Sequence, residues 1–166
     1  SIRDNDPVIF MESEQMYGDK GEVPEGEYII PIGVADVKRK GTDVTIVTFG
    51  KIYHTVEKAA QELEKNGISV EIIDLRTVRP IDYDCVFESV KKTNRLVIVE
   101  EAWPLASIST EIAYKVQREA FDHLDAPIER VTMRDVPMSY AASMVEATLP
   151  NKSRIIAAVN AVTYTK

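Results

Sequence analysis

The sequence predicts an α/β fold, namely a three-layer sandwich in which helices cover both faces of a mostly parallel five-stranded sheet. From Asp43 onwards, apolar runs of strand length alternate with segments whose apolar residues recur at helical spacing. This alternation is typical of a sheet built from strand–helix–strand units. The 166 residues, 45% of them hydrophobic, are also enough for one substantial core.

The first unit shows the pattern most clearly. Residues 44–49 read as a buried strand and Gly50 interrupts it. We expect Gly50 to serve the turn, because the chain lacks the glycine-rich phosphate-binding motifs. The following helix is predicted from spacing of three and four residues, and Gly67 marks its end. Its apolar positions are Val56, Ala59, Ala60 and Leu63.

The cycle repeats along the rest of the chain. Further strands are predicted over 69–75, 95–100 and 128–133. Helices are predicted over 82–92, along the stripe Ile108, Ile112, Val116 and Ala120, and from Asn151 through Ile155, Val159 and Val162.

The segment before Asp43 behaves differently. Residues 7–13 read as a short strand, isolated from the repeating units, whereas residues 17–26 are rich in Gly, Pro and Glu and read as a linker. We expect the isolated strand to pair within a sheet encoded upstream, which would make this chain a piece of a longer protein.

Charge and composition exclude several classes of function. The net charge of -7 opposes nucleic acid binding, which needs clustered Lys and Arg. No apolar run approaches the roughly 20 residues of a membrane span. The single cysteine, Cys85, cannot form an internal disulfide and fits a reducing compartment. These features predict a globular protein of the cytoplasm with no nucleic acid or membrane partner.

Few residues offer chemistry. His54 and His123 are the only imidazoles, and no metal-ligand spacing or nucleophile motif surrounds Cys85. His54 follows the end of a predicted parallel strand, where open α/β sheets bind ligands, although a surface role is the simpler interpretation. Glu100 and Glu101 end a strand, but consecutive strand residues face opposite ways, so we expect no shared acid–base site.

Two further features admit a structural and a functional interpretation. Trp103 is interpreted as a packing anchor rather than a cofactor platform. A polar cluster follows the second predicted strand and would either fix the next loop or bind an anion, the structural role being favoured. Its members are Asp74, Arg76, Thr77, Arg79 and Asp82. Residue patterns by themselves thus predict an α/β domain and name no reaction.

Five stretches carry a family resemblance. They are RDNDPVIFMESEQMYG from Arg3, VPEGEYIIPIGVADVKRKGTDVTIVTFG from Val23, ISVEIIDLRTVRPID from Ile68, SVKKTNRLVIVEEAWP from Ser89 and LDAPIERVTMRDVPMSYA from Leu124. Together these stretches resemble the beta subunits of 2-oxoacid dehydrogenases, particularly of pyruvate dehydrogenase, whereas DLRTVRPID alone resembles the wider transketolase carboxy-terminal domain. The sequence departs from the family pattern at two places. The AWPLASIST loop from Ala102 lacks glycines that are common in relatives, and the tail VNAVTYTK differs from familiar endings.

The resemblance implies a division of the chain and a cofactor. Residues 1–34 would contain the last strand of the preceding pyrimidine-binding domain plus a linker, and residues 35–166 would form a transketolase carboxy-terminal-like domain. The complete enzyme would use thiamine diphosphate and magnesium. Its cofactor-activating glutamate, active-site histidine and metal loop would lie upstream, so no catalytic, cofactor-binding or metal-binding residue is carried over. The 166 residues are expected to bind no cofactor and to be inactive unaided.

The resemblance also implies partners. These are the alpha subunit, a second beta subunit and the subunit-binding domain of the dihydrolipoyl acetyltransferase core, in the bacterial cytoplasm or, in a eukaryote, the mitochondrial matrix. The acidic position of the LDAP stretch, Asp125, would dock the basic core domain, or else merely solvate a loop.

The resemblance implies that the parent enzyme decarboxylates pyruvate and reductively acetylates lipoyl groups, while this portion serves assembly and docking. Alternatives are the beta subunit of a branched-chain 2-oxoacid or acetoin dehydrogenase, and a free-standing α/β interaction module.

Overall fold

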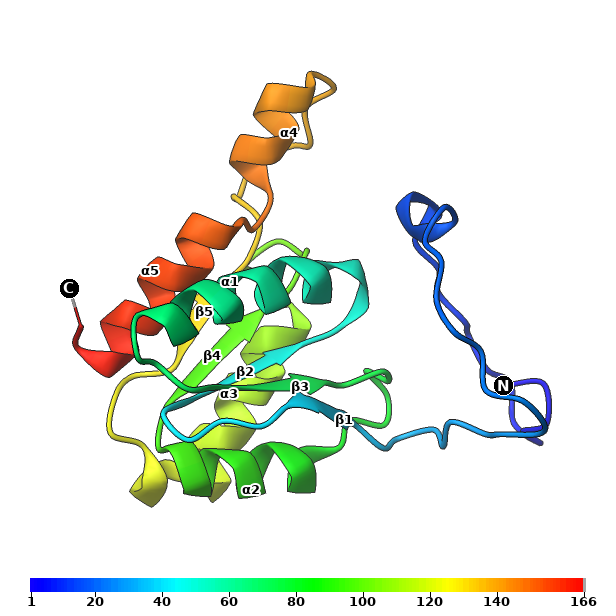
Figure 1. Cartoon of the computed structure of the whole chain (residues 1–166), viewed down its shortest axis with the longest axis horizontal. Coiled ribbons are helices and arrows are strands. Elements are labelled where there is room, and N and C mark those ends of the chain that lie inside the picture. The colour runs from blue at the N-terminus through cyan, green and yellow to red at the C-terminus, as the bar shows by residue number, and fades with distance from the viewer. Residues whose placement is uncertain (166) are drawn as a thin grey trace.

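The computed structural model describes residues 1–165 and confirms the predicted three-layer α/β sandwich (Figure 1). Within these residues the strands are β1 (Asp36–Arg39), β2 (Val44–Thr48), β3 (Val70–Asp74), β4 (Leu96–Val99) and β5 (Glu129–Val131). The α-helices are α1 (Tyr53–Lys65), α2 (Tyr83–Thr93), α3 (Ile108–Glu119), α4 (Ala142–Thr148) and α5 (Lys152–Thr163). Short 3-10 turns lie at η1 (Glu14–Met16), η2 (Gly50–Ile52) and η3 (Phe121–His123).

The sheet runs in the order β1-β3-β2-β4-β5. Strands β2 to β5 are parallel, and β1 pairs antiparallel with β3 at one edge. The sequence pattern did not predict the position of β1, because its residues, DVKR, are mostly polar and belong to an edge strand with little burial.

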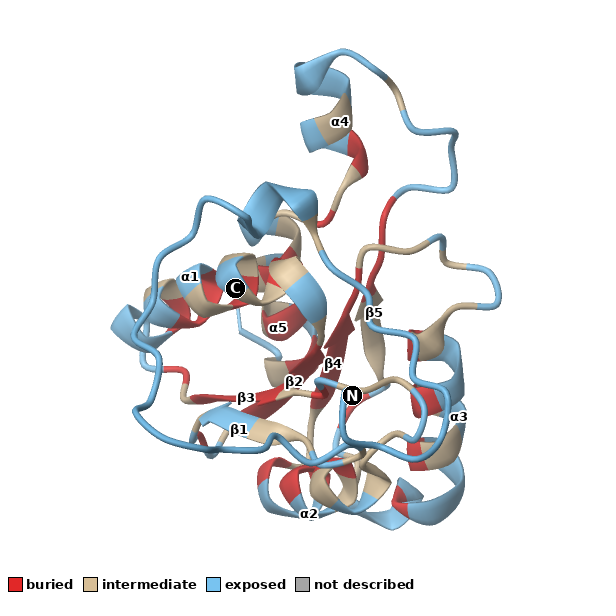
Figure 2. Ribbon diagram, turned by 90° about the vertical axis from the view of Figure 1, so that its right-hand side faces the viewer, coloured by how far each residue is buried: buried red, intermediate tan, exposed pale blue. Residues whose placement is uncertain are grey.

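Both faces of the sheet are covered by helices (Figure 2). Helices α1 and α5 pack on one face, where the core includes Ile46, Ile72 and Ile155. Helices α2 and α3 pack on the other, around Ile73, Ile98 and Ile112. Burial from both sides explains why β4 is a continuous apolar run and why every residue of β2, including Thr45 and Thr48, is buried.

One charged group is buried with its partners already in place. Glu71, on β3, accepts hydrogen bonds from the Ser89 hydroxyl and the Gly41 amide and forms an ion pair with Lys92. Burial by itself would raise the pKa of Glu71, but these donors lower it below its ordinary value. The Thr45 hydroxyl extends the network from Ser89, at 2.6 Å.

Residues 1–34 form an arm outside the sandwich (Figure 1). The strand predicted over residues 7–13 is absent here, because no partner strand lies beside this segment to receive its backbone hydrogen bonds. Its apolar side chains are exposed, Ile9 at 90%. Two hydrogen bonds fix the end of the arm to the body, from the Gly33 amide to Thr77 and from the Ala35 amide to Asp82.

Helix α4 was also not predicted from the sequence. It is short, follows a Pro- and Ser-containing loop, and projects away from the sheet (Figure 1). Among residues 1–165, no helix is both long enough and apolar enough to cross a bilayer.

Candidate interaction sites at the two edges of the sheet

Asp125 lies at the amino edge of the parallel strands, in the connection between η3 and β5. Its backbone is fixed, since the Asp125 amide donates to the Asn94 carbonyl at 2.8 Å. Its carboxylate is 57% exposed, and the nearest cation, Arg95, lies 3.7 Å away. Asp125 therefore presents a carboxylate that is held in position but remains accessible to a partner.

The chain terminus reaches the same place. The Tyr164 hydroxyl donates to the Asp125 carbonyl at 3.3 Å, and Tyr164 ends α5 in the left-handed conformation with its ring largely exposed. Residue patterns alone do not predict this contact, because Tyr164 and Asp125 are far apart along the chain and meet only after α5 packs. The family resemblance, in contrast, implies that the end of the chain lies near Asp125.

The carboxyl edge carries a second group of polar residues. Strands β2 and β4 are neighbours in the sheet, but the chain leaves them in opposite directions. From β2 it passes through α1 to β3, and from β4 it passes through α3 to β5. Open α/β sheets bind ligands at such a point, outside the carboxyl ends of the two strands. Lys51 after β2 and Glu101 after β4 form an ion pair across this point, at 3.2 Å.

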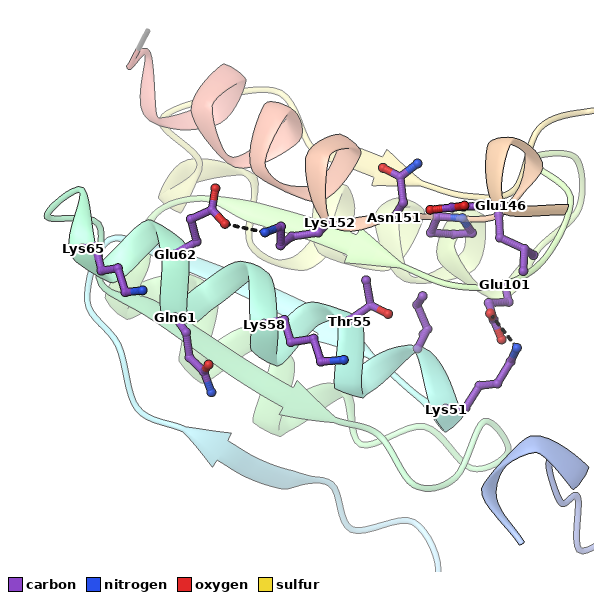
Figure 3. A pocket seen from close by; sticks show the side chains of 13 residues that line it. Lys51, Thr55, Lys58, Gln61, Glu62, Lys65, Glu101, Glu146, Asn151 and Lys152 are labelled. Atoms are coloured by element: carbon purple, nitrogen blue, oxygen red, sulfur yellow. Dashed lines mark hydrogen bonds and ion pairs between the residues drawn. The ribbon is translucent and has the colours of Figure 1, made fainter. Parts of the chain in front are cut away.

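A groove of about 650 Å³ runs from this ion pair between α1 and the start of α5 (Figure 3). Lys152 bridges its far end to Glu62 at 2.6 Å. Lys58 and Lys65 also line it. Because lysines and glutamates alternate along its walls, the groove has no strong charge of one sign.

The residues singled out at this edge have separate roles. The buried Glu100 accepts a hydrogen bond from the Ser109 amide, whereas Glu101 pairs with Lys51, so the expectation of no shared carboxylate site is confirmed. His54 is half exposed, and its Nε2 lies 3.9 Å from Asp19 of the arm. Gly50 has φ of +73°, which confirms the predicted turn role.

The polar cluster after β3 fixes its own loop, as the favoured interpretation predicted. Asp74 accepts from the Arg76 amide, and Arg76 forms an ion pair with Asp36 of β1. The Thr77 hydroxyl donates to the Pro80 carbonyl. Asp82 caps α2 by accepting from the Cys85 amide, at 3.1 Å. Arg79 has no part in these contacts.

The remaining candidates, Cys85 and His123, lie on separate elements. Cys85 is half buried on α2, and burial, followed by the charge of Asp82, raises the pKa of its thiol, which disfavours the nucleophilic thiolate. His123 lies in η3, where its carbonyl accepts from Asn94. Within residues 1–165, no group of three or more His, Cys, Asp or Glu residues is placed to hold a metal ion. The described residues thus do not fit the magnesium that the resemblance implies for the complete enzyme.

Trp103 corrects one interpretation. Its side chain is 52% exposed, so it does not anchor the core. Instead, its indole N–H donates to the Val136 carbonyl at 3.1 Å, which joins the loop after β4 to the segment leading into α4. The segments that this hydrogen bond joins carry exposed apolar side chains, and these are Trp103, Leu105, Val136, Met138, Tyr140 and Met144. We name this set of side chains the α4 patch.

Comparison with known proteins places this architecture in a family. The family described as "Transketolase, C-terminal domain" matches residues 33–155. The chain therefore belongs to the transketolase carboxy-terminal domain family. A solved structure described as "Split gene transketolase, inactive beta4 tetramer" agrees, with 26% identity and a TM-score of 0.73 over 88% of this chain and 46% of that chain.

Within the family, the chain is similar to the carboxy-terminal portion of pyruvate dehydrogenase beta subunits. It is 53% identical to the "Pyruvate dehydrogenase E1 component subunit beta" of Rhizobium meliloti, over 99% of this chain and 36% of the relative. The Rickettsia felis protein of the same name is 49% identical, over 99% and 50%. An "Acetoin:2,6-dichlorophenolindophenol oxidoreductase subunit beta" from Cupriavidus necator is 48% identical, over 95% and 47%. The chain thus spans about half or less of the length of these relatives.

Proposed function

We propose that this chain is the carboxy-terminal portion of the beta subunit of a thiamine diphosphate-dependent pyruvate dehydrogenase, and that this portion serves subunit assembly and core docking. The parent enzyme would decarboxylate pyruvate and reductively acetylate lipoyl groups of the acyltransferase core. The observation that carries the proposal is the similarity to pyruvate dehydrogenase beta subunits along 99% of the chain, at 53% identity.

The proposal assigns residues 1–34 to the end of the preceding pyrimidine-binding domain plus a linker, and residues 35–166 to the transketolase-like domain. The exposed apolar side chains of the arm, such as Ile9 and Phe10, support this assignment, because an isolated apolar segment in water lacks the burial that stabilises it. Thiamine diphosphate and magnesium would then be held by that preceding domain and by the alpha subunit, and the 166 residues would be inactive unaided.

Assembly is supported by the α4 patch. Exposed large apolar side chains, such as those of α4 and of the loop before it, are typical of surfaces that a partner covers. The occupants we propose are the alpha subunit and a second beta subunit. The structural neighbour is described as a beta4 tetramer, which supports assembly between beta chains.

Docking is supported by Asp125. The proposed partner is the small basic subunit-binding domain of the dihydrolipoyl acetyltransferase core. An exposed carboxylate on a fixed backbone suits a charge-assisted hydrogen bond to Arg or Lys, and the net charge of -7 would steer a basic domain towards this chain. Tyr164 beside it would add an aromatic contact.

The test is charge reversal at Asp125. We expect Asp125→Lys to weaken binding of an isolated subunit-binding domain by roughly tenfold or more, because a favourable charge pair becomes a repulsive one. Titration calorimetry at fixed ionic strength measures the Kd. Asp122→Lys is the matched control, since Asp122 is exposed on the neighbouring η3 turn and brings the same change in net charge. Equal affinities for the Asp125 variant and the unmodified chain would refute docking at this residue.

A beta subunit of an acetoin-oxidising enzyme is the second candidate, because such subunits are 48% and 46% identical to this chain. Bacterial relatives and a mitochondrial one, from Dictyostelium discoideum, both occur. We accordingly propose the bacterial cytoplasm, or the mitochondrial matrix in a eukaryote, as the compartment. Rates of the complete alpha and beta pair with pyruvate and with acetoin would separate the two candidates.

A further inference from the structure

A turn of the arm lies over the ligand-binding point of the sheet. Residues 14–19 approach the connection that leaves β2, and the Lys51 ammonium group donates to the Gln15 side-chain oxygen at 2.7 Å. Together they line an open polar hollow of about 230 Å³, with Gln15, Met16 and Asp19 of the arm on one side and Lys51, His54 and Glu101 of the body on the other. The turn therefore lies beside the crevice between the ends of β2 and β4.

The turn has a defined shape of its own. The Met16 amide donates to the Ser13 carbonyl at 3.0 Å, and the Asp19 amide donates to the Met16 carbonyl at 3.0 Å. The Tyr17 hydroxyl donates to the Glu12 carboxylate at 2.8 Å, which ties the turn to the residue before it. Such local hydrogen bonds reduce the entropy lost when the turn is held against another surface.

Lys51 is the residue that connects the two sides. Its side chain is 25% exposed and that of Glu101 is 23% exposed, so their ion pair is shielded more than most surface pairs. The same ammonium group reaches Gln15 of the arm. Glu101 thus holds Lys51 from the β4 side, and Lys51 holds the turn.

Charged groups occur on both surfaces. The turn contributes Glu14 and Asp19. The surface beneath it contributes Lys51, which pairs with Glu101, and His54, whose Nε2 lies 3.9 Å from an Asp19 carboxylate oxygen. The hydrogen bond from Lys51 to Gln15 is therefore the contact on which the placement of the turn depends.

We propose that the crevice at the carboxyl ends of β2 and β4 is a binding surface for the chain's own acidic turn, residues 14–19, with Lys51 as the positioning residue. We name the contact between residues 14–19 and this crevice the latch, because it fixes the arm at the edge of the sheet where open α/β folds bind ligands. This inference stands on contacts within the chain and does not require the proposed function. If residues 1–34 do end a preceding domain, which rests on the proposed function, the latch sets that domain over this edge of the sheet.

Amide hydrogen exchange measured by mass spectrometry on the 166-residue chain tests the latch. We expect Lys51→Ala to speed exchange of the amides of residues 14–19 by roughly two- to fivefold, as for loss of a modest surface contact. Gln15→Ala should have the same effect from the other side of the contact, and it leaves the folded body untouched. The control is Lys58→Ala, on helix α1, which follows the turn that carries Lys51; Lys58 lines the same groove and makes no hydrogen bond or ion pair with residues 1–34 of the arm.

Three outcomes would overturn the proposal. The first is unchanged exchange of residues 14–19 in both the Lys51 and Gln15 variants. The second is equal acceleration of that exchange in the Lys58 variant. The third is protection of residues 14–19 that rises with protein concentration, because a second copy would then supply the turn. Protection that is independent of concentration and lost in both variants supports the latch.

Discussion

The sandwich and the arm contain similar apolar residues in opposite environments. In the sandwich, Ile46 and Ile72 are fully buried between helices and neighbouring strands. In the arm, Ile9, Phe10 and Met11 form an equally apolar run and are exposed. These apolar runs differ in their neighbours and not in their apolar character.

This difference shows what an apolar run needs in order to become a strand. Strands β2, β3 and β4 each lie beside another strand that accepts and donates backbone hydrogen bonds, and each is covered by helices. The run in the arm has neither, so its backbone stays irregular. Under the proposed function, the missing neighbours are the strands of the preceding domain.

The largest effect is expected from removing apolar volume in the sandwich. Ile72→Ala should lower the free energy of unfolding by about 3 kcal/mol, because it leaves a cavity in a packed interior. The matched change in the arm, Ile9→Ala, should alter it by less than about 0.5 kcal/mol. Urea unfolding followed by circular dichroism measures both. A comparable loss in the two variants would show that the arm is packed in solution and would remove the contrast.

A smaller effect is expected from the buried charge. Glu71→Gln should cost about 2 kcal/mol at neutral pH, because it removes the ion pair with Lys92 and disturbs the hydrogen bond from Ser89. The folded pKa of Glu71 is lowered from its ordinary value of 4.5. Its contribution to stability is thus fully present above that value and is lost as the pH falls through the lowered folded pKa.

Unfolding curves of the Glu71 variant and the unmodified chain should therefore converge as the pH falls below 4.5. The arm supplies the control, since Arg3 and Glu27 form an ion pair that is mostly exposed. Glu27→Gln should leave stability essentially unchanged at every pH, because exposed ion pairs are screened by solvent. If the Glu71 variant had a lower free energy of unfolding by the same amount at every pH, the charge of Glu71 would be excluded as the cause.

Most of the sandwich could be predicted from the sequence, because its signals are local. Buried parallel strands read as continuous apolar runs, and the helices over 53–65 and 83–93 carry clear apolar stripes. Strand β1 and helix α4 were missed, since a polar edge strand and a short helix carry little periodic signal. Residues 7–13 form no strand in this structure, because pairing depends on neighbours that the run itself does not encode. Their assignment to the last strand of a preceding domain stays a prediction.

The candidate sites were less predictable than the fold. The sequence placed His54 and Glu101 near the end of strands, but it could not show that Lys51 joins Glu101 to Gln15, since these residues meet only through tertiary packing. Trp103 is interpreted from the sequence as a packing anchor, whereas its exposure depends on the loop that carries it. The docking role of Asp125 stays a prediction.

The most direct measurement is of pyruvate turnover by the purified 166-residue chain, supplied with thiamine diphosphate and magnesium. The account predicts no carbon dioxide release above the background without protein, because the groups that activate the cofactor would lie on the preceding domain and the alpha subunit. Sustained release of carbon dioxide by this chain unaided would contradict the assignment of these residues to assembly and docking.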